Sequence, residues 1–286
     1  MDIKKRPVDL VVLSDIHLGT HGCQAKDLLM YLKSIEPKTI VLNGDIIDVW
    51  QFKKRYWPKS HMKILKHLIG QAAKGIKIFY ITGNHDEVFR KFSGLKLGSL
   101  QIVNHLTLDL DGKKTWFFHG DVFDVLMKNS KWLMKIGAIG YDFLIFLNIF
   151  INSVTRIFGK GKISLSKKIK ENVKKSLKYI NDFEESAAKI AIKEGYDNIV
   201  CGHVHQAQMR RIKMAHGEIN YMNPGDWIEN LTSLEYHEKQ WKIMYFMDEY
   251  LGKVEETMQE IALEDLGNKE IFQAIMQELT CYGSIA

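Results

Sequence analysis

The chain has 286 residues and a formal net charge of +6, and this length suits one large domain or a core with an inserted lobe. Its three cysteines are scattered, and none lies at C-x-x-C spacing, which argues against a disulfide scaffold and against a thiolate zinc site. A reducing, cytoplasmic setting fits this usage. Residues 1–7 are basic but lack the apolar region of a signal peptide, so none is expected.

Predicted strands and helices alternate along the first part of the chain. In order, they are a strand at 8–13, a helix at 25–35 that ends before Pro37, a strand at 39–42, a helix at 61–74 capped by Gly75, and a strand at 78–81. This rhythm predicts a βαβ sheet. Three more strands are expected at 100–103, 106–110 and 115–119, and Asp111-Gly112 predicts a hairpin turn between the last two.

The strand pattern stops at Leu126 and returns after Gly195. In between, residues 132–158 are mostly apolar, and residues 164–191 predict one or two Lys-rich helices. The returning strands are expected at 198–201, 207–214, 218–222 and 233–247, and a tail at 263–279 has loosely helical spacing. We therefore expect a core formed by residues 1–125 and 195–262, an inserted helical cap at 126–194, and a C-terminal helical tail at 263–286.

Five polar clusters stand at or near the ends of predicted strands. The first is Asp15-Ile16-His17, whose two polar residues would share one face if the strand continued. The others are Gly44-Asp45, Gly83-Asn84-His85-Asp86, His119-Gly120-Asp121 and Gly202-His203-Val204-His205. Alone, D-x-H more often marks a surface turn than a metal site. The ordered set favours a joint metal site, because chemistry collects at the carboxyl ends of strands in open α/β sheets.

In this order, the motifs D-x-H, G-D-x-x-D, G-N-H-D, H-G-D and G-H-x-H resemble those of the calcineurin-like metallophosphoesterase superfamily, over residues 8–124 and 196–227. The runs S-D-I-H-L-G at 14–19, G-D-I-I-D-V-W at 44–50 and N-P-G-D-W at 223–227 resemble the bacterial UDP-2,3-diacylglucosamine diphosphatase branch. The resemblance implies an α/β fold, a β-sandwich flanked by helices with an inserted helical cap. It also implies hydrolysis of UDP-2,3-diacylglucosamine, a lipid A precursor, to UMP and 2,3-diacylglucosamine 1-phosphate.

The resemblance further implies two divalent metal ions that share one ligand and a hydroxide nucleophile. Carried over position by position, it assigns Asp15, His17 and His205 to the first metal, Asn84, His119 and His203 to the second, and Asp45 as the bridging ligand. Oxygen and imidazole ligands without thiolate suit Mn²⁺, Fe or Zn²⁺, and the branch favours manganese. Asp48, Asp86 and Asp121 are interpreted as partners that orient ligands, and Asp226 as a residue that shapes the site.

His85 and Asn84 are the predicted catalytic residues. In the superfamily, the histidine at the place of His85 contacts the phosphate and can protonate the leaving oxygen. The lipid A enzymes commonly carry Arg there, so this chain departs from them, and the stretch after His119-Gly120-Asp121 departs as well. The departure leaves room for monoester or other diester substrates. His21 and His61 are interpreted as ordinary loop, surface or core residues.

The predicted cap carries the positive charge of the chain. Residues 126–194 contain 14 Lys and Arg against 6 Asp and Glu, a net of +8 in a chain of +6. A basic and apolar segment suggests an acylated, anionic substrate at a membrane surface, with Lys167, Lys168 and Lys174 binding its phosphates together with His85. Alternatively, the apolar face is the cap's own core. A membrane-spanning helix at 136–158 is disfavoured by Asp142, and a nucleic-acid partner is not expected.

The sequence therefore predicts a two-metal hydrolase, peripheral on the cytoplasmic membrane face, acting on a phosphorylated and acylated small molecule. Two other functions stay open. One is a phosphatase or phosphodiesterase acting on another lipid or nucleotide phosphate, which the presence of His85 favours. The other is a non-catalytic membrane-associated scaffold, which the complete set of ligand types disfavours.

Overall fold

The computed structural model describes residues 5–50, 56–123 and 165–248. For residues 165–177 it describes the backbone but not the side chains. The chain divides into two compact units, residues 1–243 and 244–286, and the site described below lies in the first. The apolar stretch predicted at 132–158 and the tail predicted at 263–279 lie outside the described residues.

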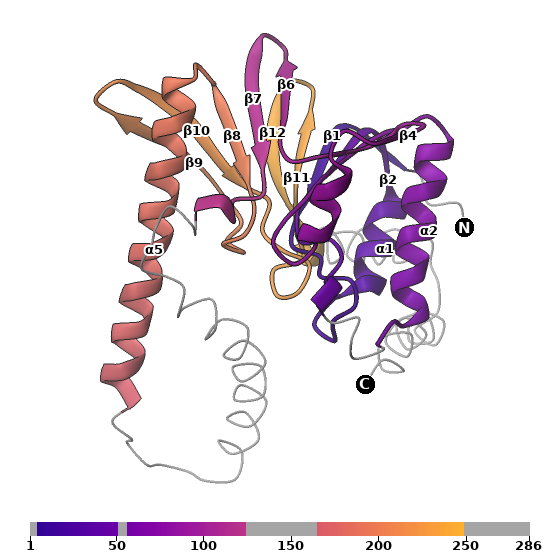
Figure 1. The fold of residues 1–286 in the computed structure, drawn as a ribbon, viewed down its shortest axis with the longest axis horizontal. Coiled ribbons are helices and arrows are strands. Elements are labelled where there is room, and N and C mark those ends of the chain that lie inside the picture. Colours follow the sequence, from indigo (N-terminus) through magenta and orange to yellow (C-terminus); the bar gives the residue numbers. More distant parts are fainter. Residues whose placement is uncertain (1–4, 51–55, 124–164, 249–286) are drawn as a thin grey trace, which may run out of the picture. The chain divides into compact units, whose positions relative to one another are not determined.

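Seven strands form the first sheet. In sheet order, they are β12 (Gln240–Tyr245), β11 (Thr232–His237), β1 (Arg6–Leu13), β2 (Ile35–Asn43), β3 (Lys77–Ile81), β5 (Leu100–Val103) and β4 (Lys96–Leu97) (Figure 1). The central strands β1, β2, β3 and β5 run parallel, while β11 pairs antiparallel with β1. Helix α1 (Ala25–Ser34) connects β1 to β2, and α2 (Lys59–Ala73) connects β2 to β3. The predicted βαβ rhythm is confirmed.

Five strands form the second sheet. In sheet order, they are β6 (Leu106–Leu110), β7 (Lys113–Phe118), β8 (Asn198–Cys201), β10 (Gly217–Asn223) and β9 (Gln208–Met214). Strands β7, β8 and β10 run parallel, and the outer strands β6 and β9 pair antiparallel with their neighbours. The chain reaches β8 through the long helix α5 (Leu165–Lys193).

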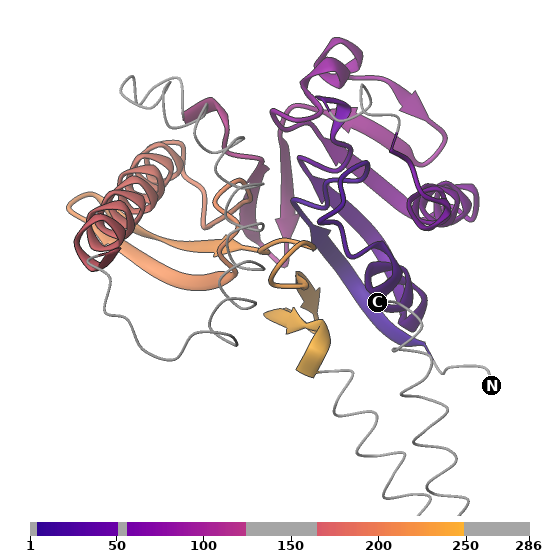
Figure 2. The ribbon, with the colours of Figure 1, turned by 90° about the horizontal axis from the view of Figure 1, so that it is seen from below.

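The two sheets form the centre of a layered α/β arrangement, with α1 and α2 outside the first sheet and α5 outside the second (Figure 2). Successive side chains along the strands of the second sheet point to opposite faces, so one set packs against the first sheet and the other against α5. Phe117 and Val200 join Val12 in the core between the sheets, whereas their neighbours Phe118 and Cys201 pack in the core beneath α5. The predicted fold, a β-sandwich flanked by helices, is confirmed.

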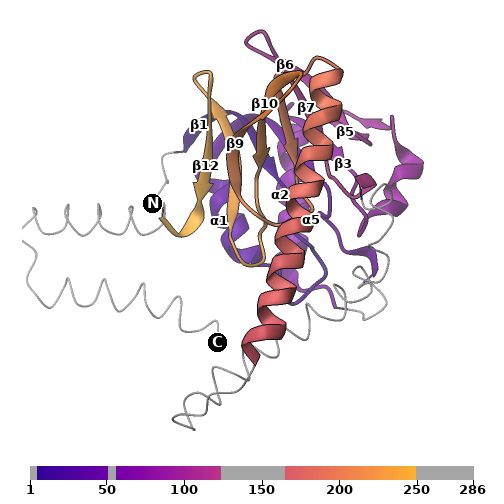
Figure 3. The ribbon, with the colours of Figure 1, turned by 90° about the vertical axis from the view of Figure 1, so that its left-hand side faces the viewer.

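Helix α5 lies along the second sheet (Figure 3). Phe183, Ala187 and Ala191 are fully buried against that sheet, and the small alanines let the helix backbone approach it closely. Glu184, only 1% exposed, pairs with Arg210 of β9. The C-terminal half of α5 therefore packs as part of the core. The start of the inserted cap stays a prediction, because residues 124–164 lie outside the described residues.

The first helix ends earlier than the hydrophobic pattern predicts. Ile35 was expected to be its last residue, but it has φ −115° and ψ 158° and begins β2. The reason is Pro37, because a residue before proline avoids the helical region and the chain must extend at Glu36. Strand β2 tolerates Pro37, which pairs with Val8 near the start of β1.

The single strand predicted at 233–247 is wrong, because the chain folds there into a hairpin of β11 and β12. The turn residues Glu238 and Lys239 have φ of 49° and 64°, the left-handed pair that matches the twist of a two-residue hairpin. Such turns usually contain Gly or Asn, so the sequence carries no strong signal for this one.

Candidate metal centre

The predicted ligands all lie in loops that follow parallel strands. Asp15 and His17 follow β1, Asp45 follows β2, Asn84 follows β3, His119 follows β7, and His203 and His205 follow β8. Backbone hydrogen bonds join these loops, from Asp15 N to Gly44 O at 3.1 Å and from Gly202 N to His119 O at 2.9 Å. The carboxyl ends of strands from both sheets thus meet at one place, as expected for an α/β site.

Left-handed backbone turns direct most of these side chains. Asp15 and His17 have φ of 52°, and Asp45, His203 and His205 have φ of 53°, 68° and 52°. Few residues other than glycine adopt this region, and those that do concentrate at functional sites. Asp15 and His17 do lie close together, as expected, but strand alternation is not the reason. Both lie beyond the end of β1, and turns bring them together.

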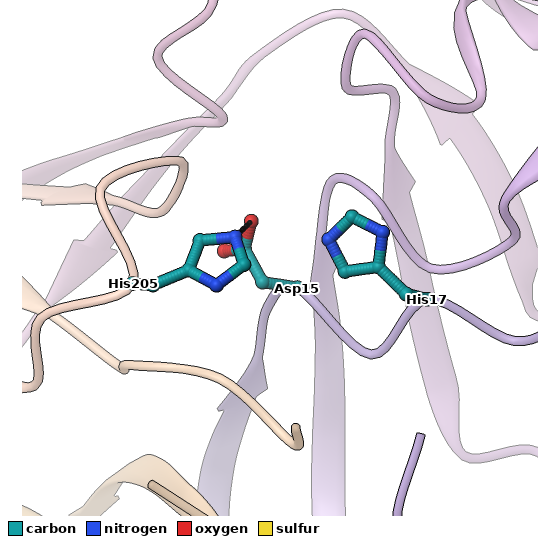
Figure 4. Close-up of side chains that lie close together, drawn as sticks. All are labelled: Asp15, His17 and His205. Carbon is teal, nitrogen blue, oxygen red and sulfur yellow. Dashed lines mark ion pairs between the residues drawn. The ribbon is translucent and has the colours of Figure 1, made fainter. Parts of the chain in front are cut away.

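The first cluster consists of Asp15, His17 and His205, whose potential ligand atoms all lie within 4.8 Å of one another. Figure 4 shows the two histidine rings approaching from different loops, with the Asp15 carboxylate between them. His205 Nε2 lies 3.1 Å from Asp15 Oδ1, and the two imidazole rings are 5.5 Å apart. This arrangement offers one oxygen and two nitrogens to a single ion.

The second cluster consists of Asp45, His119 and His203. His119 Nε2 lies 3.3 Å from Asp45 Oδ2, while His17 Nε2 of the first cluster lies 3.9 Å from the same oxygen. Asp45 thus faces both clusters, as a bridging carboxylate must. The backbone N–H of His85 donates to Asp45 Oδ1 at 2.8 Å, which holds the loop containing Asn84 against Asp45.

A third cluster, formed by His17, Asp48 and His85, lies beside the first. Asp48 Oδ2 is 3.1 Å from His85 Nδ1 and 3.6 Å from His17 Nδ1. An ionised carboxylate can only accept, so the Nδ1 atom of His85 carries the proton in this hydrogen bond. Asp48 thus orients His85 and His17 together, the role predicted for it, and turns the Nε2 edge of each ring away from itself.

The residues present fit divalent metal ions. Among the described residues, four buried atoms of predicted ligands form no hydrogen bond, namely Asp15 Oδ1, His17 Nε2, Asn84 Oδ1 and His119 Nε2. Buried polar atoms are normally satisfied, so four such atoms at one place point to a ligand that they share. Carboxylate, amide and imidazole donors suit borderline and hard divalent cations.

Opposite charges within the clusters shift the pKa values of their members. Burial opposes ionisation of Asp45, but the neighbouring His119 and His17 hold the pKa of its carboxyl well below the usual range. Burial likewise opposes protonation of His205, but Asp15 raises the pKa of this imidazole to about 9. The site therefore keeps its carboxylates ionised, which is the state that binds a cation.

Several further hydrogen bonds support the ligands. Ser14 donates from Oγ to Asp15 Oδ2 at 2.5 Å, and His119 donates from Nδ1 to the carbonyl of Asn43 at 3.0 Å. His61, interpreted from the sequence as an ordinary residue, is buried and accepts from Gly19 N at 2.9 Å, so it fixes the loop after His17. The contacts of His119 with Asn43 and of His61 with Gly19 could not be read from the sequence, because they join positions far apart along the chain.

Three acidic residues predicted to support the site take different partners. Asp86 accepts from Gly83 N at 2.6 Å, Ile46 N at 3.0 Å and Tyr80 Oη at 2.6 Å, so it fixes the loops rather than a ligand side chain. Asp226 accepts from backbone N–H groups of its own loop, at 2.8 Å from Ile228. Asp121 pairs with Arg90.

The predicted phosphate-binding residues Lys167, Lys168 and Lys174 lie on α5, but within the part of that helix whose side chains are not described. No helix among residues 5–50, 56–123 and 165–248 is both long and apolar enough to cross a membrane. The segment 136–158, disfavoured above as a spanning helix, lies outside these ranges.

Comparison with known families agrees with this geometry. The model of the family described as calcineurin-like phosphoesterase matches residues 8–207, a range that holds every predicted ligand. The chain belongs to the calcineurin-like phosphoesterase family. It is therefore a metal-dependent phosphoesterase, and the alternative of a non-catalytic scaffold is set aside.

Curated relatives carry the name UDP-2,3-diacylglucosamine hydrolase, so the resemblance to this branch is confirmed. The protein of Aliivibrio fischeri (strain MJ11) is 23% identical over 237 residues, which are 80% of this chain and 95% of the relative. That of Blochmanniella pennsylvanica (strain BPEN) is 24% identical over 243 residues, 83% of this chain and 96% of the relative. That of Porphyromonas gingivalis (strain ATCC BAA-308 / W83) is 31% identical over 116 residues, 38% and 44% of the two chains.

Proposed function

We propose that this phosphoesterase cleaves the pyrophosphate bond of UDP-2,3-diacylglucosamine, giving UMP and 2,3-diacylglucosamine 1-phosphate. The observation that carries the proposal is a pair of ligand clusters joined by Asp45, which belongs to the second cluster and lies 3.9 Å from His17 of the first. The chain is also similar over 80% of its length to a hydrolase named for this substrate. Clustered metals near one another are the usual arrangement for in-line displacement at phosphorus.

The residues divide the work as follows. Asp15, His17 and His205 would hold one ion, Asn84, His119 and His203 the other, and Asp45 both. When bound, the ions supply Lewis acidity to the phosphoryl oxygens and lower the pKa of water. His85 is 25% exposed at its side chain and is held at Nδ1 by Asp48. As the imidazolium, it also carries a proton at Nε2, which it donates to the leaving phosphoryl oxygen.

Three further parts of the proposal concern the surroundings of the site. The ions are manganese, since mixed oxygen and imidazole ligation without thiolate suits Mn²⁺. The part of residues 126–194 that precedes the packed C-terminal half of α5 forms a cap that binds the acyl chains, and its lysines bind phosphates. This cap also holds the enzyme at the cytoplasmic face of the membrane, because the net charge of +8 on residues 126–194 attracts anionic lipids.

Hydrolysis of UDP-2,3-diacylglucosamine by the Mn²⁺-loaded protein tests the substrate directly, beside bis(p-nitrophenyl) phosphate and p-nitrophenyl phosphate. We expect UMP release, and a loss of about 10²–10³-fold in Asn84→Ala, because the amide oxygen is a metal ligand in this proposal. Turnover of the generic esters without UMP release would reject the lipid A substrate while keeping the metal site. That outcome would favour another lipid or nucleotide phosphate, the alternative that His85 in place of Arg supports.

The cap lysines are tested by vesicle binding. Replacing Lys167, Lys168 and Lys174 together by Glu should weaken sedimentation with anionic phosphatidylglycerol vesicles by about 100-fold, since each basic residue near such a surface contributes roughly 1 kcal/mol. The matched control is the same change at Lys59, Lys63 and Lys66, which are three exposed lysines on α2. Equal effects of the two triple variants would show a nonspecific charge effect and contradict the assignment.

A further inference from the structure

Arg90 stands beside the site without a role in the proposed chemistry. It lies on the short 3-10 helix η2 (Glu87–Phe92), which begins directly after Asn84-His85-Asp86. Its guanidinium donates from Nη2 to Asp121 of the H-G-D loop, and the two side chains are 35% and 12% exposed. The pair therefore ties η2 to the loop that carries His119.

Most of the donors of Arg90 remain available. A guanidinium has five N–H donors, and the hydrogen bond to Asp121 is the one that the described residues provide. Its Nε atom is buried and has no hydrogen-bond partner among those residues. Because the side chain is 35% exposed, its remaining Nη donors can receive an anion from solvent.

The position of Arg90 complements that of His85. His85 belongs with the first cluster, since its ring is 4.7 Å from that of His17 and shares Asp48 with it. Arg90 is tied to Asp121, which stands two residues after His119, a member of the second cluster. The imidazole thus belongs with one cluster, and the guanidinium is tied to the loop of the other.

We propose that Arg90, oriented by Asp121, binds the second phosphoryl group of a diphosphate substrate. The proposal rests on the proposed function, because only a substrate with two linked phosphoryl groups needs this second anion site. Arg90 supplies a guanidinium five residues after His85, on the short helix that follows the Asn84-His85-Asp86 motif. A planar fork of donors suits phosphate oxygens better than a point charge does.

Competition by two inorganic anions tests the proposal without the lipid or the nucleotide. Inhibition constants of pyrophosphate and orthophosphate are measured against hydrolysis of bis(p-nitrophenyl) phosphate, with free Mn²⁺ held constant. In Arg90→Ala, the ratio of the pyrophosphate to the orthophosphate constant should rise about 10–100-fold, whatever happens to the basal rate, because charge-assisted hydrogen bonds to one phosphoryl group are lost. An unchanged ratio would overturn the proposal.

Two more variants complete the design. Arg211→Ala is the matched control, since Arg211 is 58% exposed and pairs with Glu218 on the second sheet, and its ratio should equal that of the unmodified protein. If Arg90→Ala does not fold, Arg90→Lys is measured instead. We expect its ratio of pyrophosphate to orthophosphate inhibition constants to rise about threefold or more, because lysine lacks the planar set of donors of a guanidinium. Failure of the proposed function would instead appear as absent UMP release, which this assay does not involve.

Discussion

Replacing Asp45 by Asn is expected to lower kcat about 10³-fold or more for every substrate and to reduce bound metal from about two ions per chain to about one. Asp45 is 2% exposed, and its carboxylate lies 3.3 Å from His119 Nε2 and 3.9 Å from His17 Nε2. An amide of the same shape keeps the packing, but it is neutral and offers one oxygen in place of two. It therefore cannot serve both ions.

Metal content measured by plasma mass spectrometry, together with steady-state rates on bis(p-nitrophenyl) phosphate, provides both readouts. The control is Asp9→Asn. Asp9 lies within β1 and pairs with the exposed Lys38, away from the carboxyl end of the strand where the ligands gather. This variant should keep its metal content and its rate. Retention of both ions in Asp45→Asn would show that another residue joins the clusters.

The order of the motifs is what made the site predictable. Each ligand stands next to a buried strand in the sequence, and parallel strands bring their carboxyl ends to one edge regardless of the details of the loops. The clusters of Asp15, His17 and His205 and of Asp45, His119 and His203 assemble for that reason. That these residues meet at one place follows from strand positions, which hydrophobic runs reveal well. Their division between two ions came from the resemblance to the metallophosphoesterase motifs.

Local geometry and long-range partners were not predictable in the same way. The left-handed φ of 52° at Asp15 and His17 replaces the strand alternation expected from D-x-H, and no glycine marks either position. The pairing of Arg90 with Asp121 joins two segments separated by 31 positions, and the composition of neither segment predicts the contact. Contacts of this kind follow from tertiary packing, which local patterns do not encode.

Gly83→Ala is expected to lower both activity and stability, although Gly83 is not itself a predicted ligand. A Cβ atom at this position would lie 2.2 Å from Asp45 Oδ1 and 2.8 Å from His119 Cδ2, distances that real side chains do not tolerate. Its backbone N–H also donates to Asp86 at 2.6 Å, so the loop cannot move away without losing that bond. The metal ligands must therefore shift, and a displacement of about 1 Å at a catalytic group costs roughly 100-fold in rate.

The free energy of unfolding of Gly83→Ala should fall by about 1–3 kcal/mol in urea titrations, the usual cost of overpacking. Gly70→Ala is the matched control with the opposite sign. Gly70 lies within α2, and a Cβ there meets nothing within 4 Å, so alanine should stabilise the helix by about 0.5–1 kcal/mol and leave activity unchanged. Full activity in Gly83→Ala would mean that the loops after β2 and β3 do not approach as closely as the structure places them, since the clash follows from that approach alone.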